Sequence, residues 1–340
     1  MASFSDLWEA YRLRHKRRYL LLRAIHRRRH LRSVADRTAA IRRDSLLVFA
    51  TMRNEAARLP WFFTHYRAMG INHFLIVDNG SDDGTVELLA AQPDVSLWST
   101  GKSYRLSRFG VDWVSWLLFR YGHGHWCLTV DADELLIYPY HDTRPLPALT
   151  EWLDRSGIRV FPAMMLELYP KGPIDAQRYL PGQDPTEVLG WYDAGNYTIA
   201  RQDQTRALWI QGGPRARMSF ADRPRHAPTL SKLPLVHWNR RWIYLNSTHA
   251  LLPRRLNEAY DRLGGEKISG LLLHTKFLPE VVGKSAEEKQ RREHFGRPEN
   301  FDAYYDDLIA APDFWTPHST RYEGWRALEA RGLMSRGGWI

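Results

Sequence analysis

Cysteine is almost absent from this chain, because Cys127 is the single example among 340 residues. A lone thiol cannot form an internal disulfide, and Cys127 lies in an apolar run where a reduced thiol behaves as a small hydrophobic side chain. The chain also lacks the roughly 20 consecutive apolar residues of a membrane span and the apolar core of a signal peptide. We therefore expect a soluble, cytoplasmic protein.

Two nucleotide-binding motifs are also missing. The chain contains neither G-x-G-x-x-G nor G-x-x-x-x-G-K-[ST], which disfavours a dinucleotide dehydrogenase and a P-loop NTPase. It has no internal repeat, and 44% of its residues are hydrophobic. A chain of this length and composition can bury a full core, so we expect a folded protein of enzyme size.

Acidic residues are absent from the segment that carries most of the positive charge. The formal net charge is +10, and ten Arg or Lys residues lie between Arg12 and Arg32 without any Asp or Glu. Such a helix suits an anionic membrane surface, a solvated position on its own domain, or a nucleic-acid backbone, and charge alone does not choose among these partners. At helical spacing, the apolar residues of this segment form a stripe: Leu7, Trp8, Tyr11, Tyr19, Leu22 and Ile25.

After Arg43, short apolar runs alternate with helical patterns. This alternation, with strands apolar on both faces, indicates an α/β fold with a doubly wound, mostly parallel, Rossmann-like sheet. Strands are predicted at residues 45–50, 73–78, 95–99 and 125–130, and helices at 59–70, 85–92, 104–122, 285–295 and 322–334.

The chain divides into three parts by composition. Residues 1–43 form a basic N-terminal helical segment, residues 44–280 a central α/β domain, and residues 281–340 a C-terminal helical cap. Within the central part, residues 170–240 are rich in Pro, Gly, Arg and Trp. The many aromatic residues argue against disorder there, so we expect an ordered, irregular insertion over the site.

Polar clusters follow three of the predicted strands, at "TMRNEAARL" (51–59), "DNGSDDGT" (78–85) and "DADE" (131–134). Because ligands of such sheets bind beyond the carboxyl ends of the strands, we expect the three clusters to converge on one crevice. By itself, the first cluster is also typical of simple helix capping, and the second is more typical of a turn.

The "DADE" cluster places three carboxylates after a buried strand, where they repel one another unless a cation or proton lies among them. Alternate residues of an extended chain project to the same side, so Asp131 and Asp133 offer two hard oxygen ligands that suit Mg²⁺ or Mn²⁺. The simpler interpretation is a turn with solvated acids.

Together, "RNEAARLPWFFTHYRAMGINHFLIVDNGSDDGT" and, about fifty residues later, "WCLTVDADELLIYP" resemble a known family. They are similar to the nucleotide-sugar-binding half of bacterial family 2 glycosyltransferases, which have the GT-A fold. The resemblance covers residues 45–140 and implies a GT-A-like catalytic domain that uses a nucleotide sugar and a divalent metal. It favours a UDP-sugar as the donor.

The resemblance also implies roles for individual residues. Thr51, Arg53, Asn54 and Glu55 would border the nucleotide, Asp78 would contact the base or ribose, and Asp83 would shape that pocket. The metal ligands would be Asp131, Asp133 and His274 of "HTKF", with Lys276 reaching a phosphate oxygen.

Transfer with inversion needs a general base near the acceptor hydroxyl, normally Asp or Glu. Candidates are Glu167, polar within an apolar run, and Asp193 in "WYDAGNY". A buried Glu167 paired with an arginine is the competing interpretation. His249, Arg215 and Arg217 are further candidates for contact with sugar or acceptor phosphate.

These expectations describe a metal-dependent glycosyltransferase, inverting by family resemblance, that acts on a cell-surface glycan or lipid-linked acceptor. It would lie in the cytoplasm, peripherally on the inner face of an anionic membrane through its basic helix. The alternative is a nucleic-acid-binding nuclease or nucleotidyltransferase, which also uses paired carboxylates. Residues 45–100 are mixed in charge, which disfavours a nucleic-acid groove. A third possibility is a non-catalytic fold that binds sugar or a partner.

Overall fold

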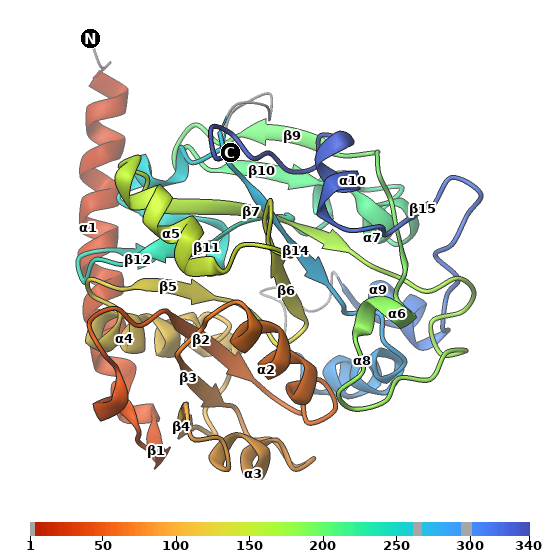
Figure 1. Ribbon diagram of the computed structural model, residues 1–340, viewed down its shortest axis with the longest axis horizontal. Coiled ribbons are helices and arrows are strands. Elements are labelled where there is room, and N and C mark those ends of the chain that lie inside the picture. The colour runs from red at the N-terminus through yellow and green to blue at the C-terminus, as the bar shows by residue number, and fades with distance from the viewer. Residues whose placement is uncertain (1–3, 261–266, 294–300) are drawn as a thin grey trace.

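The computed structural model describes residues 4–260, 267–293 and 301–340. Its centre is a nine-stranded sheet of order β1-β4-β3-β2-β5-β11-β7-β14-β6, crossed by helices on both faces (Figure 1). The sheet strands are β1 (Arg32–Ala35), β2 (Leu47–Met52), β3 (His73–Asp78), β4 (Val95–Ser99), β5 (Trp126–Thr129), β6 (Glu134–Ile137), β7 (Val160–Glu167), β11 (Ser231–His237) and β14 (Gly270–His274).

Three two-stranded pairs lie outside this sheet. They are formed by β8 (Trp191–Tyr192) with β15 (Thr320–Arg321), β9 (Thr198–Arg201) with β10 (Leu208–Gln211), and β12 (Ile243–Tyr244) with β13 (Leu251–Leu252). The helices are α1 (Phe4–Arg27), α2 (Leu59–Ala68), α3 (Thr85–Ala90), α4 (Val111–Tyr121), α5 (Leu146–Arg155), α6 (Pro185–Val188), α7 (Gly213–Met218), α8 (Glu280–Arg291), α9 (Asp302–Ile309) and α10 (Trp325–Ala330).

The direction of the strands confirms the predicted fold class. Strands β4, β3, β2 and β5 are mutually parallel. Strand β11 is antiparallel to both β5 and β7, so β7 points the same way as the first four strands. Strand β14 is parallel to β7 and therefore shares this direction. Only β1, β11 and β6 run in the opposite direction. The carboxyl ends of the six parallel strands therefore meet at one edge.

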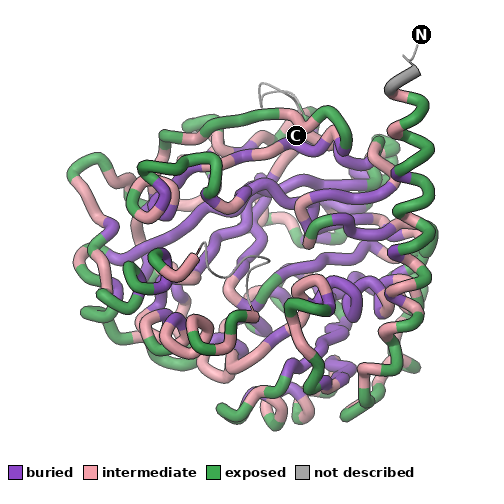
Figure 2. The backbone as a smooth tube through the Cα atoms, turned by 180° about the vertical axis from the view of Figure 1, so that it is seen from behind, coloured by how far each residue is buried: buried purple, intermediate pink, exposed green. Residues whose placement is uncertain are grey.

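Both faces of the sheet are covered, which makes it doubly wound. Along β2, Val48 and Ala50 face the core that contains α2, whereas Leu47 and Phe49 face the core that contains α4. Burying a side chain such as Phe49 stabilises the fold by about 1.5–3 kcal/mol. The buried backbone of the sheet runs through the middle of the molecule (Figure 2).

The helix predicted at 104–122 is interrupted, which corrects that prediction. Arg108, Phe109 and Gly110 have φ values of 55°, 57° and 74°, and α4 begins only after them. Left-handed backbone cannot continue a right-handed helix. A Cβ on Gly110 would lie 2.8 Å from Thr51 Oγ1, so glycine is required where this loop touches the end of β2.

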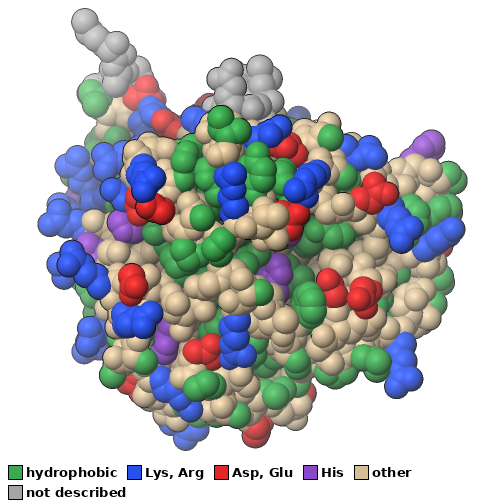
Figure 3. Space-filling view, viewed as in Figure 1, with side chains coloured by type: hydrophobic (Ala, Val, Ile, Leu, Met, Phe, Trp, Pro, Cys, Tyr) green, Lys and Arg blue, Asp and Glu red, His purple; other side chains and the backbone are tan. Residues whose placement is uncertain are grey.

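The basic N-terminal segment contributes both a helix and a strand. Leu13, Leu20 and Ala24 of α1 are buried against the body of the protein, and β1 pairs with β4 at the edge of the central sheet. Residues 1–43 are therefore not helical throughout. Lys and Arg side chains gather along this edge of the molecule (Figure 3).

The C-terminal helices differ in extent from their predictions. Helix α8 begins at Glu280, earlier than predicted, and α10 spans only Trp325–Ala330. Residues 294 and 295 of the predicted charged helix lie outside the described residues. Among the helices that the structure describes, none has the length and apolarity to cross a membrane.

Candidate active site

The carboxylates of "DADE" are divided between two cationic partners. Lys232 on β11 places its ammonium Nζ 3.1 Å from Asp131 Oδ2 and in contact with Glu134 Oε1. Asp133 points elsewhere, and its Oδ2 lies 3.2 Å from Nε2 of His274. A buried lysine therefore supplies a cation that three crowded carboxylates require.

His274 is positioned by the register of β14. This strand pairs His274 with Glu134 of β6 on one side and with Glu167 of β7 on the other. Its Nδ1 lies 3.5 Å from Glu167 Oε1, and Glu167 in turn contacts the Arg215 guanidinium of α7. Asp133, which is partly exposed, and the buried His274, Glu167 and Arg215 thus form a row of alternating charge.

The pKa directions agree with this row. Burial raises the pKa of Asp133, but His274, Arg58 and Lys276 oppose burial, and the net pKa is well below its usual value. Burial lowers the pKa of His274, yet Asp133 and Glu167 outweigh it and raise the pKa. Burial also raises the pKa of Glu167, but Arg215 and His274 bring it below its usual value. In this row, the charged form of each group is stabilised by the oppositely charged neighbours on either side.

Asp133 and His274 form a donor set that fits a divalent cation such as Mn²⁺. A carboxylate oxygen and an imidazole nitrogen face each other, and Mg²⁺-like ions bound by one or two protein ligands usually keep waters and take substrate phosphates. In the described part of the chain, no group of three or more His, Cys, Asp or Glu is arranged to hold a metal. Asp131, a further predicted metal ligand, contacts Lys232, and its role as a ligand stays a prediction.

Arg53 and Glu55, predicted to border the nucleotide, are tied to α8. Arg53 donates to the Gly80 carbonyl at 2.5 Å and to Glu287 at 2.7 Å. Glu55 pairs with Lys284 at 2.8 Å and with Arg58 at 3.1 Å. Burial raises the pKa of Glu55, against the lowering effect of these two cations. Helix α8 therefore borders the crevice at the ends of β2 and β3.

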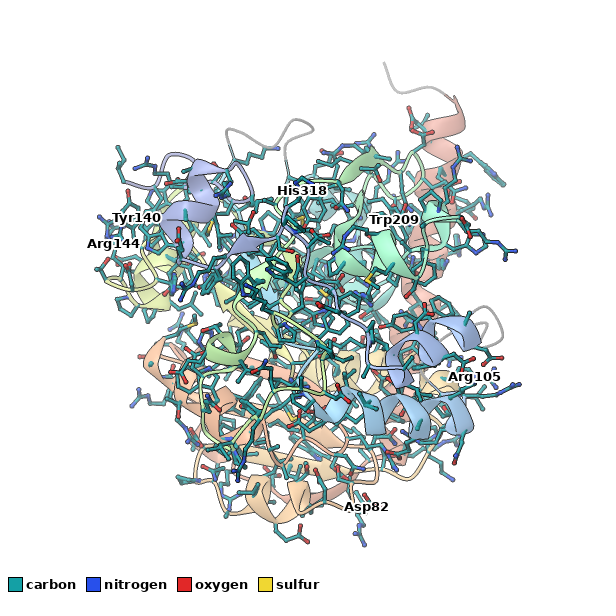
Figure 4. All side chains as sticks on the ribbon, turned by 90° about the vertical axis from the view of Figure 1, so that its right-hand side faces the viewer. Asp82, Arg105, Tyr140, Arg144, Trp209 and His318 are labelled. Carbon is teal, nitrogen blue, oxygen red and sulfur yellow. The ribbon has the colours of Figure 1, made fainter. Side chains whose placement is uncertain are left out.

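Glu293, which follows α8, contacts the loop after β4. Its carboxylate accepts from Ser103 Oγ at 2.7 Å and from the Arg105 backbone N–H at 2.7 Å. Figure 4 shows Arg105 beside the C-terminal helices and Asp82 at the rim formed by the loop after β3. Glu293 thereby connects the loop after β4 to the segment that follows α8, at the edge where β2 and β3 end.

Asp78, Asp83 and Asn54 hold the loop after β3 in shape. Asp78 accepts from the Gly80 backbone N–H at 3.0 Å and contacts the hydroxyl of Ser81. Asp83 accepts from the backbone N–H groups of Ala56 and Thr85, each at 3.0 Å. The structure brings all three beside Arg53 and Glu55, as predicted from the strand ends, and in each case the observed bonds are those of turns and caps.

Lys276 lies two residues beyond His274 and is half-buried. Its ammonium lies 5.7 Å from the ring centre of Tyr304, and its charge helps to lower the pKa of Asp133. Arg58 donates to the Thr275 carbonyl at 2.7 Å. Lysine and arginine side chains therefore surround the Asp133–His274 pair.

The two candidate bases occupy different surroundings. Glu167 is fully buried in the row with His274 and Arg215. The carboxylate of Asp193 accepts from Tyr169 Oη at 2.5 Å and from Arg217 Nε at 3.1 Å. The competing interpretation of Glu167, a buried acid paired with an arginine, describes the observed contact. The structure describes no contact that joins Asp193 to this row.

Two contacts were not predicted from the sequence: those of Lys232 with the "DADE" acids, and the hydrogen bond from Arg58 to the Thr275 carbonyl. The available signal for Lys232 was a single charged residue at the start of the apolar run "KLPLVHW". His249 is nearby: its Nδ1 lies 2.7 Å from the Ser231 carbonyl, and burial, followed by the charge of Lys232, lowers its pKa to about 4. His249 is therefore neutral at pH 7.

Comparisons with known proteins give limited information. No protein-family model matches the chain, and no curated protein matches it significantly. Among solved structures, similarity was found to a mannosyltransferase from Pyrobaculum calidifontis in complex with GDP-Man and Mn²⁺, with 20% identity and a TM-score of 0.24, over 49% of this chain and 48% of that one. The chain thus spans about half the length of this neighbour.

Two further solved structures overlap with the chain. A 4-diphosphocytidyl-2C-methyl-D-erythritol synthase has 14% identity and a TM-score of 0.24, covering 42% of this chain and 68% of that one. A putative glucose-1-phosphate thymidylyltransferase from Bacillus anthracis, in complex with a sucrose, has 10% identity and a TM-score of 0.28, covering 78% and 83%. All three TM-scores are below 0.5, so these overlaps establish no activity for this chain.

Proposed function

We propose that this protein is a metal-dependent glycosyltransferase that moves a sugar from a nucleoside-diphosphate donor to a glycan or lipid-linked acceptor, with inversion. The observation that carries the proposal is the Asp133–His274 pair, 3.2 Å apart, at the edge where the parallel strands end. Lys276 and Arg58 lie close enough to lower the pKa of Asp133. A carboxylate and imidazole surrounded by cations suit a cation-bound diphosphate.

In this proposal, the residues of the site hold the donor and stabilise the leaving group. Asp133 and His274 would bind Mn²⁺ or Mg²⁺, and Glu167 would orient the imidazole from its other nitrogen. The bound ion offsets charge on the departing nucleoside diphosphate. Lys276 would donate to a phosphate oxygen as the bond to the anomeric carbon breaks. Thr51, Arg53, Asn54, Glu55, Asp78 and Asp83 would form the nucleotide side of the crevice.

Glu167 and Asp193 remain the predicted candidates for the general base. A base must reach the proton of the acceptor hydroxyl. The buried position of Glu167 and its lowered pKa support orientation of His274 as its main contribution. Asp193 already accepts hydrogen bonds from Arg217 and Tyr169, so only its remaining lone pairs could accept the proton of an acceptor hydroxyl.

Calorimetric titration of UDP and GDP, each with and without Mn²⁺, tests the proposal and names the base of the donor. We expect binding that requires the metal in the wild type and is lost in Asp133→Asn. Asp44→Asn is the matched control, because Asp44 is exposed and lies before the amino end of β2. Metal-independent binding, or full binding in Asp133→Asn, would contradict the assigned site. Failure to bind either nucleotide, together with salt-sensitive binding to DNA or RNA, would favour the nucleic-acid alternative.

We further propose that α1 holds the protein on the inner face of an anionic membrane. Leu13, Leu20 and Ala24, which lie outside the predicted apolar stripe, bury one side of the helix. Five of the six stripe residues remain exposed beside the arginines. Exposed aromatic residues flanked by basic ones suit the lipid headgroup region. The exposed side chains are Leu7, Trp8, Tyr11, Tyr19 and Leu22, between 51% and 67% accessible.

A further inference from the structure

A small cavity of about 30 Å³ lies beside Asp131, between the ends of β2 and β5. Its polar lining consists of Thr51, Thr129, Asp131, Lys232, Ser247 and Thr248. A space of this volume holds one or two groups of the size of a water molecule. Because the Asp131 side chain is 54% accessible, the lining includes a group that solvent and ligands can reach.

Among the described residues, three threonine hydroxyls of this cavity have no hydrogen-bond partner: those of Thr51, Thr129 and Thr248. In the described part of the chain, Thr51 Oγ1 and Thr248 Oγ1 are both buried and unpaired. Thr248 as a whole is only 6% accessible. Buried polar atoms are normally satisfied, and an unsatisfied hydroxyl costs stability. Phe109 and Ser247, which also line the cavity, hold left-handed backbone with φ values of 57° and 46°. Unpaired atoms and strained backbone together are typical of a place that a ligand completes.

The charges of the cavity select a particular kind of ligand. Lys232 donates to Asp131 and Glu134, so one of its three ammonium hydrogens remains available. The two carboxylates outnumber this single cation, which disfavours an anion. A neutral hydroxyl can both accept from Lys232 and donate to Asp131. The rings of Phe109 and Tyr244 add apolar surface against which C–H groups pack.

We propose that this cavity is a hydroxyl-recognition subsite, which takes a hydroxyl of the bound nucleotide sugar and completes the bonds of Thr51, Thr248 and Lys232. The inference rests on the proposed function, because Asp131 lies two residues from Asp133, where the diphosphate would be held. Both the ribose and the transferred sugar adjoin a diphosphate and carry hydroxyls. The shared chemistry is therefore a sugar hydroxyl, and the two sources must be separated by experiment.

Thr248→Val and Thr51→Val each remove one of the three unpaired hydroxyls with little change of shape. The probes are UDP, GDP, UDP-glucose and GDP-mannose, titrated with Mn²⁺ into the wild type and each variant. Ser115→Ala is the matched control, because Ser115 Oγ is also buried and unpaired but does not line the cavity. We expect each threonine variant to bind a recognised ligand about ten-fold more weakly, which corresponds to one lost hydrogen bond, without a fall in Tm.

The results distinguish the two sources. Equal loss for a nucleoside diphosphate and its sugar conjugate assigns the subsite to ribose, whereas a loss confined to the conjugate assigns it to the transferred sugar. Unchanged affinities in both variants, with wild-type nucleotide binding intact, would overturn the subsite alone. Absence of nucleotide binding in the wild type would overturn the proposed function and the subsite with it. In all cases Ser115→Ala should bind as the wild type does.

Discussion

Lys232 Nζ lies 3.1 Å from Asp131 Oδ2, although the two residues are 101 positions apart in the sequence. The same ammonium contacts Glu134, which is fully buried. Lys232 offsets part of the charge of these two acids, and Asp133 is the carboxylate of "DADE" that faces His274. Each acid of the cluster thus contacts a lysine or histidine of the protein itself.

Lys232→Met should destabilise the fold strongly. The change leaves Glu134 buried without its cation, and breaking a buried pair from one side typically costs about 3–5 kcal/mol. Urea unfolding at pH 7 measures the loss. The double variant Lys232→Met with Glu134→Gln removes the unpaired charge and should recover part of it. Equal stability of the single and double variants would show that the two side chains are not coupled.

The stability of the metal-free protein should depend on pH from both sides. The raised pKa of His274 contributes stability below its unfolded pKa, near 6.5, and this contribution is lost as pH rises through the folded pKa. The lowered pKa values of Asp133 and Glu167 contribute stability above about pH 4–4.5, which is lost as pH falls through their folded values.

Thermal unfolding in EDTA between roughly pH 4 and 9 tests this dependence. His274→Gln keeps a polar side chain without the titrating charge, so it should flatten the decline of Tm above about pH 6.5. If Tm declines above about pH 6.5 in His274→Gln as steeply as in the wild type, the decline results from the titration of another group.

Removing the exposed apolar side chains of α1 should release the protein from anionic vesicles. We expect Trp8→Ser, Tyr11→Ser, Tyr19→Ser and Leu22→Ser together to weaken partitioning at least about ten-fold, because four groups leave the headgroup region. Co-sedimentation with vesicles that contain phosphatidylserine measures it, and raised salt should weaken the wild type as well. The matched control is Leu180→Ser with Ile199→Ser, two exposed apolar residues outside α1. Equal loss in the control, or no loss in the α1 variant, would argue against this surface.

Gly110→Ala should cost more than Gly84→Ala. Both glycines precede a helix with positive φ, 74° and 91°, where an alanine costs about 1–2 kcal/mol. The added Cβ at Gly110 would lie 2.8 Å from Thr51 Oγ1, whereas nothing lies within 4 Å at Gly84. The difference between the two unfolding free energies therefore isolates the steric clash. Similar losses would mean that the loop before α4 can move away from β2.

Local patterns were sufficient to predict much of the N-terminal half of the central sheet. Strands β3 and β4 span the predicted residues 73–78 and 95–99, because a wholly apolar run bounded by turn residues specifies a strand buried on both faces. The convergence of the polar clusters followed from the rule that parallel strands end at one edge. Helix 104–122 was misjudged because its left-handed residues, Arg108 and Phe109, carry no compositional signal.

By itself, the sequence determined the fold class, the positions of the first strands along the chain and the presence of an acidic cluster after β5. These features depend on the pattern of neighbouring residues. Tertiary structure decided how the acids are partnered. Strand β11 lies between β5 and β7, which brings Lys232 to Asp131, and β14 lies between β7 and β6, which brings His274 to Asp133 and Glu167. Sequence spacing does not indicate these distant pairings, because only the assembled sheet places the strands side by side.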